Sequence, residues 1–303
     1  MSELQAMMSQ VVTALVQAKR SPILRTPEDE GLAYEDVKIT ALDGIELDAW
    51  FIPADSDKVI ICNHFSPGNR YGYPGHLEEF NTSGGFEVNF IPKYKALHDA
   101  GYNVLTYDMR NHGTSQEANG GISTVGAYEW QDVVGSINYI RNREDTKDFR
   151  IGLQSNCMGA EATFIAMEKM PEAFNDIEAL VAAQPLSGEP MIQRMVDGAG
   201  MPPQMYSLAI EAYDKALREQ TGFGVDRYDM PKIAHLVKMP TLLLQVKDDL
   251  MTKPFDMENI FANLGTNDKK LVWVEGTPMR FHGYTYFSEK PQEMVEWFNT
   301  YMK

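Results

Sequence analysis

Residues 150–167 have the sequence RIGLQSNCMGAEATFIAM, in which a short apolar segment runs directly into a turn of small residues and then into a helical segment. Cys157 stands at the apex of this turn, with Ser155 two residues before it and Gly159 two residues after it. A sharp strand-to-helix turn strains the backbone of its apex residue, so the neighbours two residues away must be small. The pattern therefore predicts a nucleophile elbow, with the Cys157 thiol at the junction of a strand and a helix.

Segments typical of strands and helices alternate on both sides of this turn. We expect buried strands at residues 58–63, 102–108, 177–184, 240–246 and 269–276, with helical segments between them. Apolar strands that alternate with helices are typical of a parallel sheet covered on both faces. The sequence thus predicts an α/β fold with a mostly parallel central sheet. Alternating residues on either side of Asp43-Gly44 predict an antiparallel N-terminal hairpin at the sheet edge.

Two long segments interrupt this alternation. Residues 66–89 form a Gly/Pro-rich loop, and residues 187–239 contain two or three helical stretches between successive strands. An insertion at 187–239 would lie over the carboxyl ends of the strands, where open α/β sheets bind ligands. We therefore predict an N-terminal helix and lead-in (1–30), a core (31–186 and 240–303) and a helical lid (187–239).

Composition restricts the classes of function. The 303 residues are 44% hydrophobic and 23% charged, as in an ordinary soluble globular protein with a large core. There are 27 Lys and Arg against 43 Asp and Glu, a net charge of -16, which disfavours nucleic acids and anionic membranes as partners. The only cysteines, Cys62 and Cys157, show neither a CxxC pair nor metal-ligand spacing. We therefore expect a cytoplasmic protein without metal or cofactor, in which Cys62 is a core residue.

The N-terminal segment has the pattern of an amphipathic helix. It has no basic region before its apolar part, which disfavours a signal peptide, and no window reaches the roughly 18 apolar residues of a membrane span. Its apolar residues recur at the spacing of one face of a helix; they are Leu4, Met8, Val11, Val12, Leu15 and Val16. We expect this helix to pack on the protein or to form a homodimer contact.

Four stretches resemble enzymes of the α/β-hydrolase family, in the family's order, and the resemblance covers nearly all of residues 36–303. They are AGYNVLTYDMRNHGTS (100–115), SNCMGA (155–160), PTLLLQVKDDLMTKP (240–254) and EGTPMRFHGYTYF (275–287). The elbow resembles that of dienelactone hydrolase-type enzymes, which also use cysteine. It departs from the family pattern in carrying Ser155 in place of glycine. The resemblance implies the α/β-hydrolase fold.

The family's chain order of nucleophile, acid and histidine implies a catalytic triad of Cys157, Asp249 and His282. Asp248 is the alternative acid, but the family places the acid three residues beyond the end of the strand, which selects Asp249. The other acid position of the family, after the preceding strand, holds Gln184. His282 is the only histidine that follows the last predicted strand, and His112 resembles a structural turn histidine of the family.

The resemblance also implies an oxyanion hole formed by the backbone N–H groups of Phe65 and Met158. Candidate substrate-binding residues are Arg70, Tyr71, Tyr73 and His76 in the long loop and Met191 and Met195 in the predicted lid. His64 is a further candidate, because it resembles the histidine that precedes the oxyanion loop in the family. Methionines in a lid can line an adaptable apolar pocket, although they can equally be ordinary core residues.

The predicted chemistry is that of a cysteine nucleophile. A helix N-terminus and a neighbouring imidazole both lower the pKa of a thiol, and we expect both effects at Cys157. We therefore predict an enzyme that attacks a small-molecule ester, thioester or lactone carbonyl and forms an acyl-cysteine intermediate. The alternatives are an acyltransferase or cyclase, which passes the acyl group to an amine or carbon nucleophile, and a non-catalytic ligand-binding member of the fold.

Overall fold

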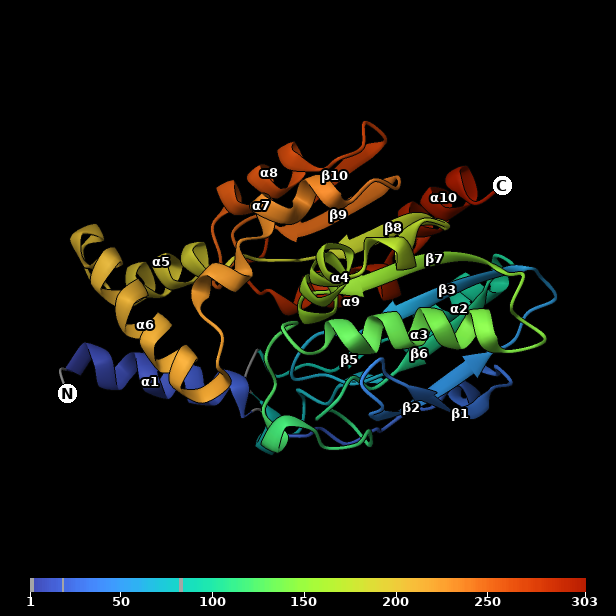
Figure 1. Cartoon of the computed structure of the whole chain (residues 1–303), viewed down its shortest axis with the longest axis horizontal. Helices are drawn as coiled ribbons and strands as arrows, with labels where there is room; N and C mark the ends of the chain where they lie inside the picture. The colour runs from blue at the N-terminus through green and yellow to red at the C-terminus, as the bar shows by residue number, and fades with distance from the viewer. Residues whose placement is uncertain (1–2, 18, 82–83) are drawn as a thin grey trace.

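The computed structural model describes residues 3–17, 19–81 and 84–303, and its centre is an eight-stranded sheet (Figure 1). The strands, in their order across the sheet, are β1 (Glu35–Thr40), β2 (Glu46–Ile52), β6 (Asn103–Tyr107), β3 (Lys58–Asn63), β7 (Arg150–Asn156), β8 (Ile177–Ala183), β9 (Thr241–Val246) and β10 (Lys269–Val274). From β6 to β10 neighbouring strands are parallel, whereas β1 and β2 form an antiparallel hairpin joined to β6. The predicted sheet and its N-terminal hairpin are confirmed.

Helices cover both faces of the sheet. One face packs against α3 (Trp130–Asn142), α4 (Met158–Lys169), α7 (Met230–Ile233) and α8 (Pro254–Asn263); the other packs against α2 (Ile91–Asp99), α9 (Phe281–Glu289) and α10 (Gln292–Tyr301). Because strand side chains alternate between faces, Val59 and Ile61 belong to the first core and Ile60 and Cys62 to the second. The apolar runs seen in the sequence therefore fill two cores. Cys62 is buried, as predicted for a core residue.

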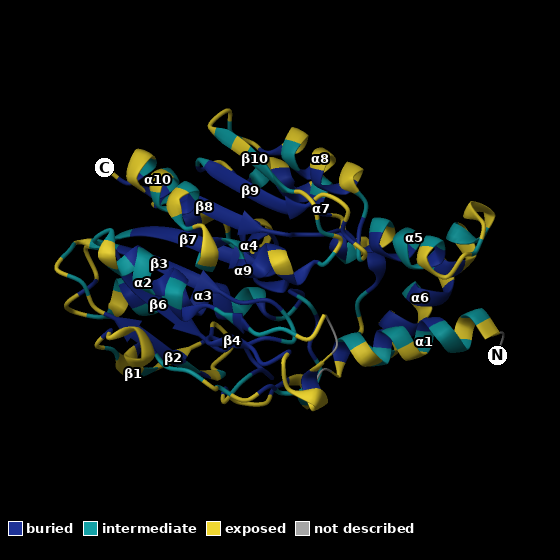
Figure 2. Cartoon of the chain, turned by 180° about the vertical axis from the view of Figure 1, so that it is seen from behind, coloured by how far each residue is buried: buried dark blue, intermediate teal, exposed yellow. Residues whose placement is uncertain are grey.

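Residues 187–239 form α5 (Gly188–Gly198), α6 (Tyr206–Thr221) and α7, and the first two project beyond the carboxyl ends of the strands (Figure 1). The N-terminal helix α1 (Glu3–Val16) lies beside α6 (Figures 1 and 2). Its residues Met8, Val12 and Val16 are buried, and Thr13 Oγ1 donates a hydrogen bond to Gln220 Oε1 at 3.2 Å. The N-terminal helix thus packs on the protein, and the homodimer contact stays a prediction.

The long loop after β3 contains the short strands β4 (Gly72–Tyr73) and β5 (Val88–Asn89), which pair antiparallel. Tyr71, Tyr73 and Phe80 are buried, and these three residues of the loop pack in the second core. Among the described residues, no helix is long and apolar enough to span a membrane.

Candidate active site

The turn between β7 and α4 has the backbone of a nucleophile elbow. Cys157 has φ 45° and ψ -116°, a conformation rare for a residue with a side chain, and its N–H donates to the Ala183 carbonyl at 2.8 Å. A Cβ atom on Gly159 would lie 2.7 Å from the carbonyl oxygen of Asn63, at the end of β3. Only glycine therefore allows β3 to pass this close to the turn.

Serine in place of glycine at position 155 is explained by a buried polar cluster. Asn63 Nδ2 donates to Ser155 Oγ at 2.9 Å, and Ser155 Oγ lies 3.0 Å from Thr163 Oγ1. The Tyr107 hydroxyl donates to Asn63 Oδ1 at 2.7 Å. The serine hydroxyl thus helps to hold the end of β3 against the elbow, which a glycine could not do.

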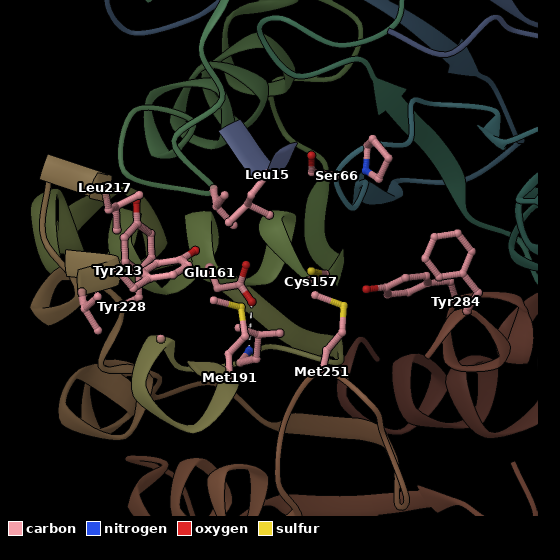
Figure 3. Close-up of a pocket in the computed structure, with 16 residues that line it drawn as sticks. Leu15, Ser66, Cys157, Glu161, Met191, Tyr213, Leu217, Tyr228, Met251 and Tyr284 are labelled. Atoms are coloured by element: carbon pink, nitrogen blue, oxygen red, sulfur yellow. Dashed lines mark hydrogen bonds between the residues drawn. The ribbon is translucent and has the colours of Figure 1, made fainter. Parts of the chain in front are cut away.

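A cavity of about 180 Å³ opens in front of Cys157, between the carboxyl ends of the strands and the helices of residues 187–239 (Figure 3). Ser66 and Pro67 line it from the loop after β3, and Leu15 lines it from α1. Its remaining wall is mostly apolar and aromatic: Val125, Leu186, Met191, Tyr213, Leu217, Val225, Tyr228, Met251, Phe281 and Tyr284. Cys157 is 8% exposed and borders this cavity.

The position expected for a triad histidine is filled by Arg280. Arg280 Nη1 forms a buried ion pair with Asp249 Oδ2, which also accepts from Gln245 Nε2 at 2.7 Å. Arg280 Nη2 donates to the Gln184 carbonyl, and Arg280 Nε donates to the Tyr284 hydroxyl at 2.7 Å. Asp249 therefore orients a guanidinium instead of an imidazole.

The side chains of Arg280 and Tyr284 neighbour the Cys157 thiol and favour its charged form. Burial nevertheless raises the pKa of the Cys157 thiol above its ordinary value, and the Glu161 carboxyl raises it further, although Arg280 and the Tyr284 hydroxyl lower it. The expectation of a lowered thiol pKa is thus wrong. The imidazole on which it relied lies elsewhere, and desolvation outweighs the effect of Arg280 and Tyr284.

His282 points away from the elbow. The residue is exposed, and its Nδ1 atom lies 2.6 Å from Thr277 Oγ1. Its ring stacks on Phe86, with 4.9 Å between the ring centroids. Helix α9 begins at Phe281, and residues four apart share one face of a helix whereas residues two apart do not. Arg280 and Tyr284 therefore both face Cys157, and His282 faces the other way. The structure does not bring Cys157, Asp249 and His282 together as a triad.

Of the two candidate acids, Asp249 is buried at the site and Asp248 is exposed. The loop that carries Phe65 lies against the elbow, because Gly159 N–H donates to the His64 carbonyl at 3.1 Å. The Phe65 ring stacks on Tyr284, with 4.1 Å between centroids. Met158 begins α4, where the first N–H groups have no partner within the helix. The oxyanion roles of Phe65 and Met158 stay predictions.

Most of the candidate substrate-binding residues lie outside the cavity lining. Met191 lines the cavity, and Met195 is a partly buried residue packed against the core. His64, Arg70, Tyr71 and Tyr73 are buried, and His76 is exposed.

The partners of these buried residues show a structural role. The His64 ring accepts from the Met109 N–H at 2.9 Å, Arg70 pairs with Asp108, and the Tyr71 hydroxyl bonds to Glu87. These contacts fasten the loop to the core.

Three side chains that neighbour Cys157 were missed from the sequence. Arg280 and Tyr284 lie in the predicted histidine loop, and Glu161 follows Cys157 by one helical turn, so spacing was an available signal for all three. Another contact was also missed: Ser66 Oγ lies 3.1 Å from Nε2 of the buried His112. Among the residues described, no group of three or more His, Cys, Asp or Glu could hold a metal ion.

No family model and no curated protein matches the sequence. Among solved structures, an esterase from Pyrococcus furiosus (Pf2001) is similar with a TM-score of 0.69 and 23% identity, over 95% of this chain and 98% of that one. A dienelactone hydrolase from Anabaena variabilis is similar with a TM-score of 0.55 and 18% identity, over 89% of this chain and 98% of that one. The α/β-hydrolase GrgF from a Penicillium species is similar with a TM-score of 0.58 and 17% identity, over 89% of this chain and 99% of that one. With its sheet order, its elbow and these likenesses over nearly its whole length, the chain has the α/β-hydrolase fold.

Proposed function

We propose that this protein is a cysteine-dependent enzyme that cleaves a small ester, thioester or lactone through Cys157. The observation that carries the proposal is the Cys157 thiol, which stands on a strained elbow, borders an apolar cavity and has Tyr284 and Arg280 as neighbours that favour its charged form. A strained backbone conformation costs on the order of 1–3 kcal/mol and is concentrated at functional sites. The similar structures include an esterase and a dienelactone hydrolase, which agrees with carbonyl chemistry.

The mechanism follows from the groups around the sulfur. The Cys157 thiol first loses its proton to water. The thiolate then attacks the carbonyl carbon, the C–S bond forms as the bond to the leaving oxygen or sulfur breaks, and the leaving group takes a proton from water. Water finally attacks the acyl-cysteine, which releases the carboxylic acid and returns the free thiol. The Arg280 cation stabilises the thiolate, and the Tyr284 hydroxyl donates a hydrogen bond to it. This proposal assigns no role to His282. Because the thiol pKa is raised, the thiolate fraction at neutral pH is below the few per cent of a free cysteine. Turnover should therefore increase as the pH rises.

The cavity limits the size of the acyl group. Its volume of about 180 Å³ is slightly larger than the ~150 Å³ of an engineered protein cavity that binds benzene. By that comparison it holds an acyl group of about six to eight non-hydrogen atoms. Long fatty acyl chains do not fit within it.

A second candidate function, ligand binding without turnover, is favoured by one observation. Asp249 forms its ion pair with Arg280, so the described residues hold no imidazole beside Cys157 to accept the thiol proton. A protein of this kind would bind its ligand in the same cavity, and that binding would survive removal of the Cys157 sulfur.

One experiment separates these functions. The protein is incubated with short-chain acyl thioesters and aryl esters between pH 7 and pH 9.5, and release of the leaving group and the intact mass are both followed. The proposal expects turnover and an acyl adduct, both absent in Cys157→Ala and both retained in the matched Cys62→Ala variant. Equal turnover in Cys157→Ala and the parent would refute it. An added amine tests the acyltransferase alternative, because an amide product would show transfer instead of hydrolysis.

A further inference from the structure

The cavity contains a carboxyl group that the proposed mechanism does not use. Glu161 is 1% exposed, lies in the first turns of α4 and lines the cavity beside Cys157 (Figure 3). Its Oε1 atom accepts a hydrogen bond from the Leu186 N–H at 2.9 Å. Its Oε2 atom is buried and makes no hydrogen bond with any described residue. A buried polar atom without a partner costs free energy, so this oxygen requires an explanation.

The surroundings of Glu161 keep its carboxyl protonated. Burial is the largest cause that raises its pKa, to about 8, and the nearby Asp256 carboxylate raises it further. The Leu186 N–H and the Arg280 charge lower it but do not outweigh burial. The other titratable groups that interact with it are Cys157 and Tyr228, whose hydroxyl donates to the Thr124 carbonyl. At neutral pH Glu161 therefore carries a proton that it can donate into the cavity.

We propose that Glu161 is a specificity residue, which donates a hydrogen bond from Oε2 to an oxygen atom within the acyl chain of the substrate. The inference rests on the proposed function, since the acyl group must lie in the cavity in front of Cys157. The wall around Glu161 is otherwise mostly apolar, with Val125, Met191 and Leu217 among its residues. One helical turn, about 5.4 Å along the axis, separates Glu161 from Cys157. The partner oxygen, an ether, keto or hydroxyl group, thus lies about three to five bonds from the reacting carbonyl.

The test uses two neutral probes of equal size in the Cys157→Ala protein, which cannot form an acyl adduct. The probes are 4-methoxybutanamide and hexanamide, in which one ether oxygen replaces one methylene group, and their binding is measured by calorimetry or by competition. An ether oxygen can only accept a hydrogen bond, so it needs the protonated form of Glu161. We expect the ether probe to bind about five- to tenfold more tightly at pH 6.5, as one hydrogen bond predicts.

Two variants and the pH dependence make the test specific. The preference for the ether should disappear above pH 8, because ionised Glu161 has no proton to donate, and it should disappear at every pH in Glu161→Leu. Glu161→Gln keeps an N–H donor without a titratable group, so it should keep the preference at both pH values. Equal binding of the two probes at pH 6.5, or no binding of the ether, would overturn the inference. If instead the preference is found but the parent protein never forms an acyl adduct, the proposed function fails, and the hydrogen bond from Glu161 to a ligand oxygen in the cavity stands.

Discussion

The stability of this protein should depend on pH through the buried carboxyl of Glu161. Its pKa is about 8 in the folded chain and is near the ordinary value of 4.5 when the chain is unfolded. Between these values the folded chain holds a proton that the unfolded chain has lost, so the free energy of unfolding decreases as the pH rises. This contribution is fully present below pH 4.5 and is lost by pH 8. At about 1.4 kcal/mol for each pH unit between the two pKa values, the loss from pH 5 to pH 8 is about 3–4 kcal/mol.

Glu161→Gln removes this titration and keeps the acceptor for the Leu186 N–H. Urea unfolding at pH 5 and pH 8, followed by tryptophan fluorescence, measures the change in stability for each protein. We expect the wild type to lose about 3–4 kcal/mol more than Glu161→Gln across this range. The matched control is Glu211→Gln, at an exposed position of α6, which should lose as much as the wild type.

Other buried carboxyls with raised pKa values, such as that of Asp132 at about 7, titrate in both proteins and cancel in the comparison. An identical loss of stability in the wild type and in Glu161→Gln would refute the assignment of a protonated buried carboxyl.

Three further predictions concern the elbow and its neighbours. Tyr284→Phe removes a hydrogen bond to the sulfur, so the pKa of Cys157 should rise and alkylation by iodoacetamide at pH 8 should slow about tenfold; an unchanged rate would contradict that contact. Gly159→Ala forces a Cβ atom against the end of β3, so it should lower the free energy of unfolding by about 1–3 kcal/mol and reduce activity. The control Gly198→Ala has open space around its Cβ atom and should be neutral or slightly stabilising. Equal stabilities of the two variants would count against the elbow geometry. His282→Gln should leave turnover unchanged, and a large loss would show that its ring reaches the substrate.

The sequence was sufficient to predict the sheet and the elbow because both leave local signals. Apolar strands alternating with helices predicted the parallel sheet, and small residues around Cys157 predicted the turn, where Gly159 is required by the approach of Asn63. The spacing after β9 also selected the buried Asp249 over the exposed Asp248.

The sequence could not predict which side chains after β10 face Cys157. The residues MRFHGYTYF offer both Arg280 and His282 to the site, and the choice depends on where α9 begins. A start at Phe281 directs Arg280 and Tyr284 toward Cys157 and His282 toward Phe86. Motif order does not carry this information.

Glu161 illustrates a second limit. Its spacing of four residues from Cys157 places it one turn along α4. One of its carboxyl oxygens lacks a partner because of the way Leu186 and the helices of residues 187–239 pack around it. This packing joins segments that are distant in the sequence. Spacing could therefore nominate this residue but could not show its free oxygen.

The most direct test of the central claim is to trap the acyl group on the protein. The enzyme is mixed with a short-chain acyl thioester at pH 9, quenched in acid within seconds and digested, and the peptide that carries residue 157 is examined by mass spectrometry. We predict an acyl adduct on Cys157 that appears within the first turnover, decays as product forms, and is absent from the peptide with Cys62. Product formation without any adduct on Cys157, or turnover that continues in Cys157→Ala, would contradict the account.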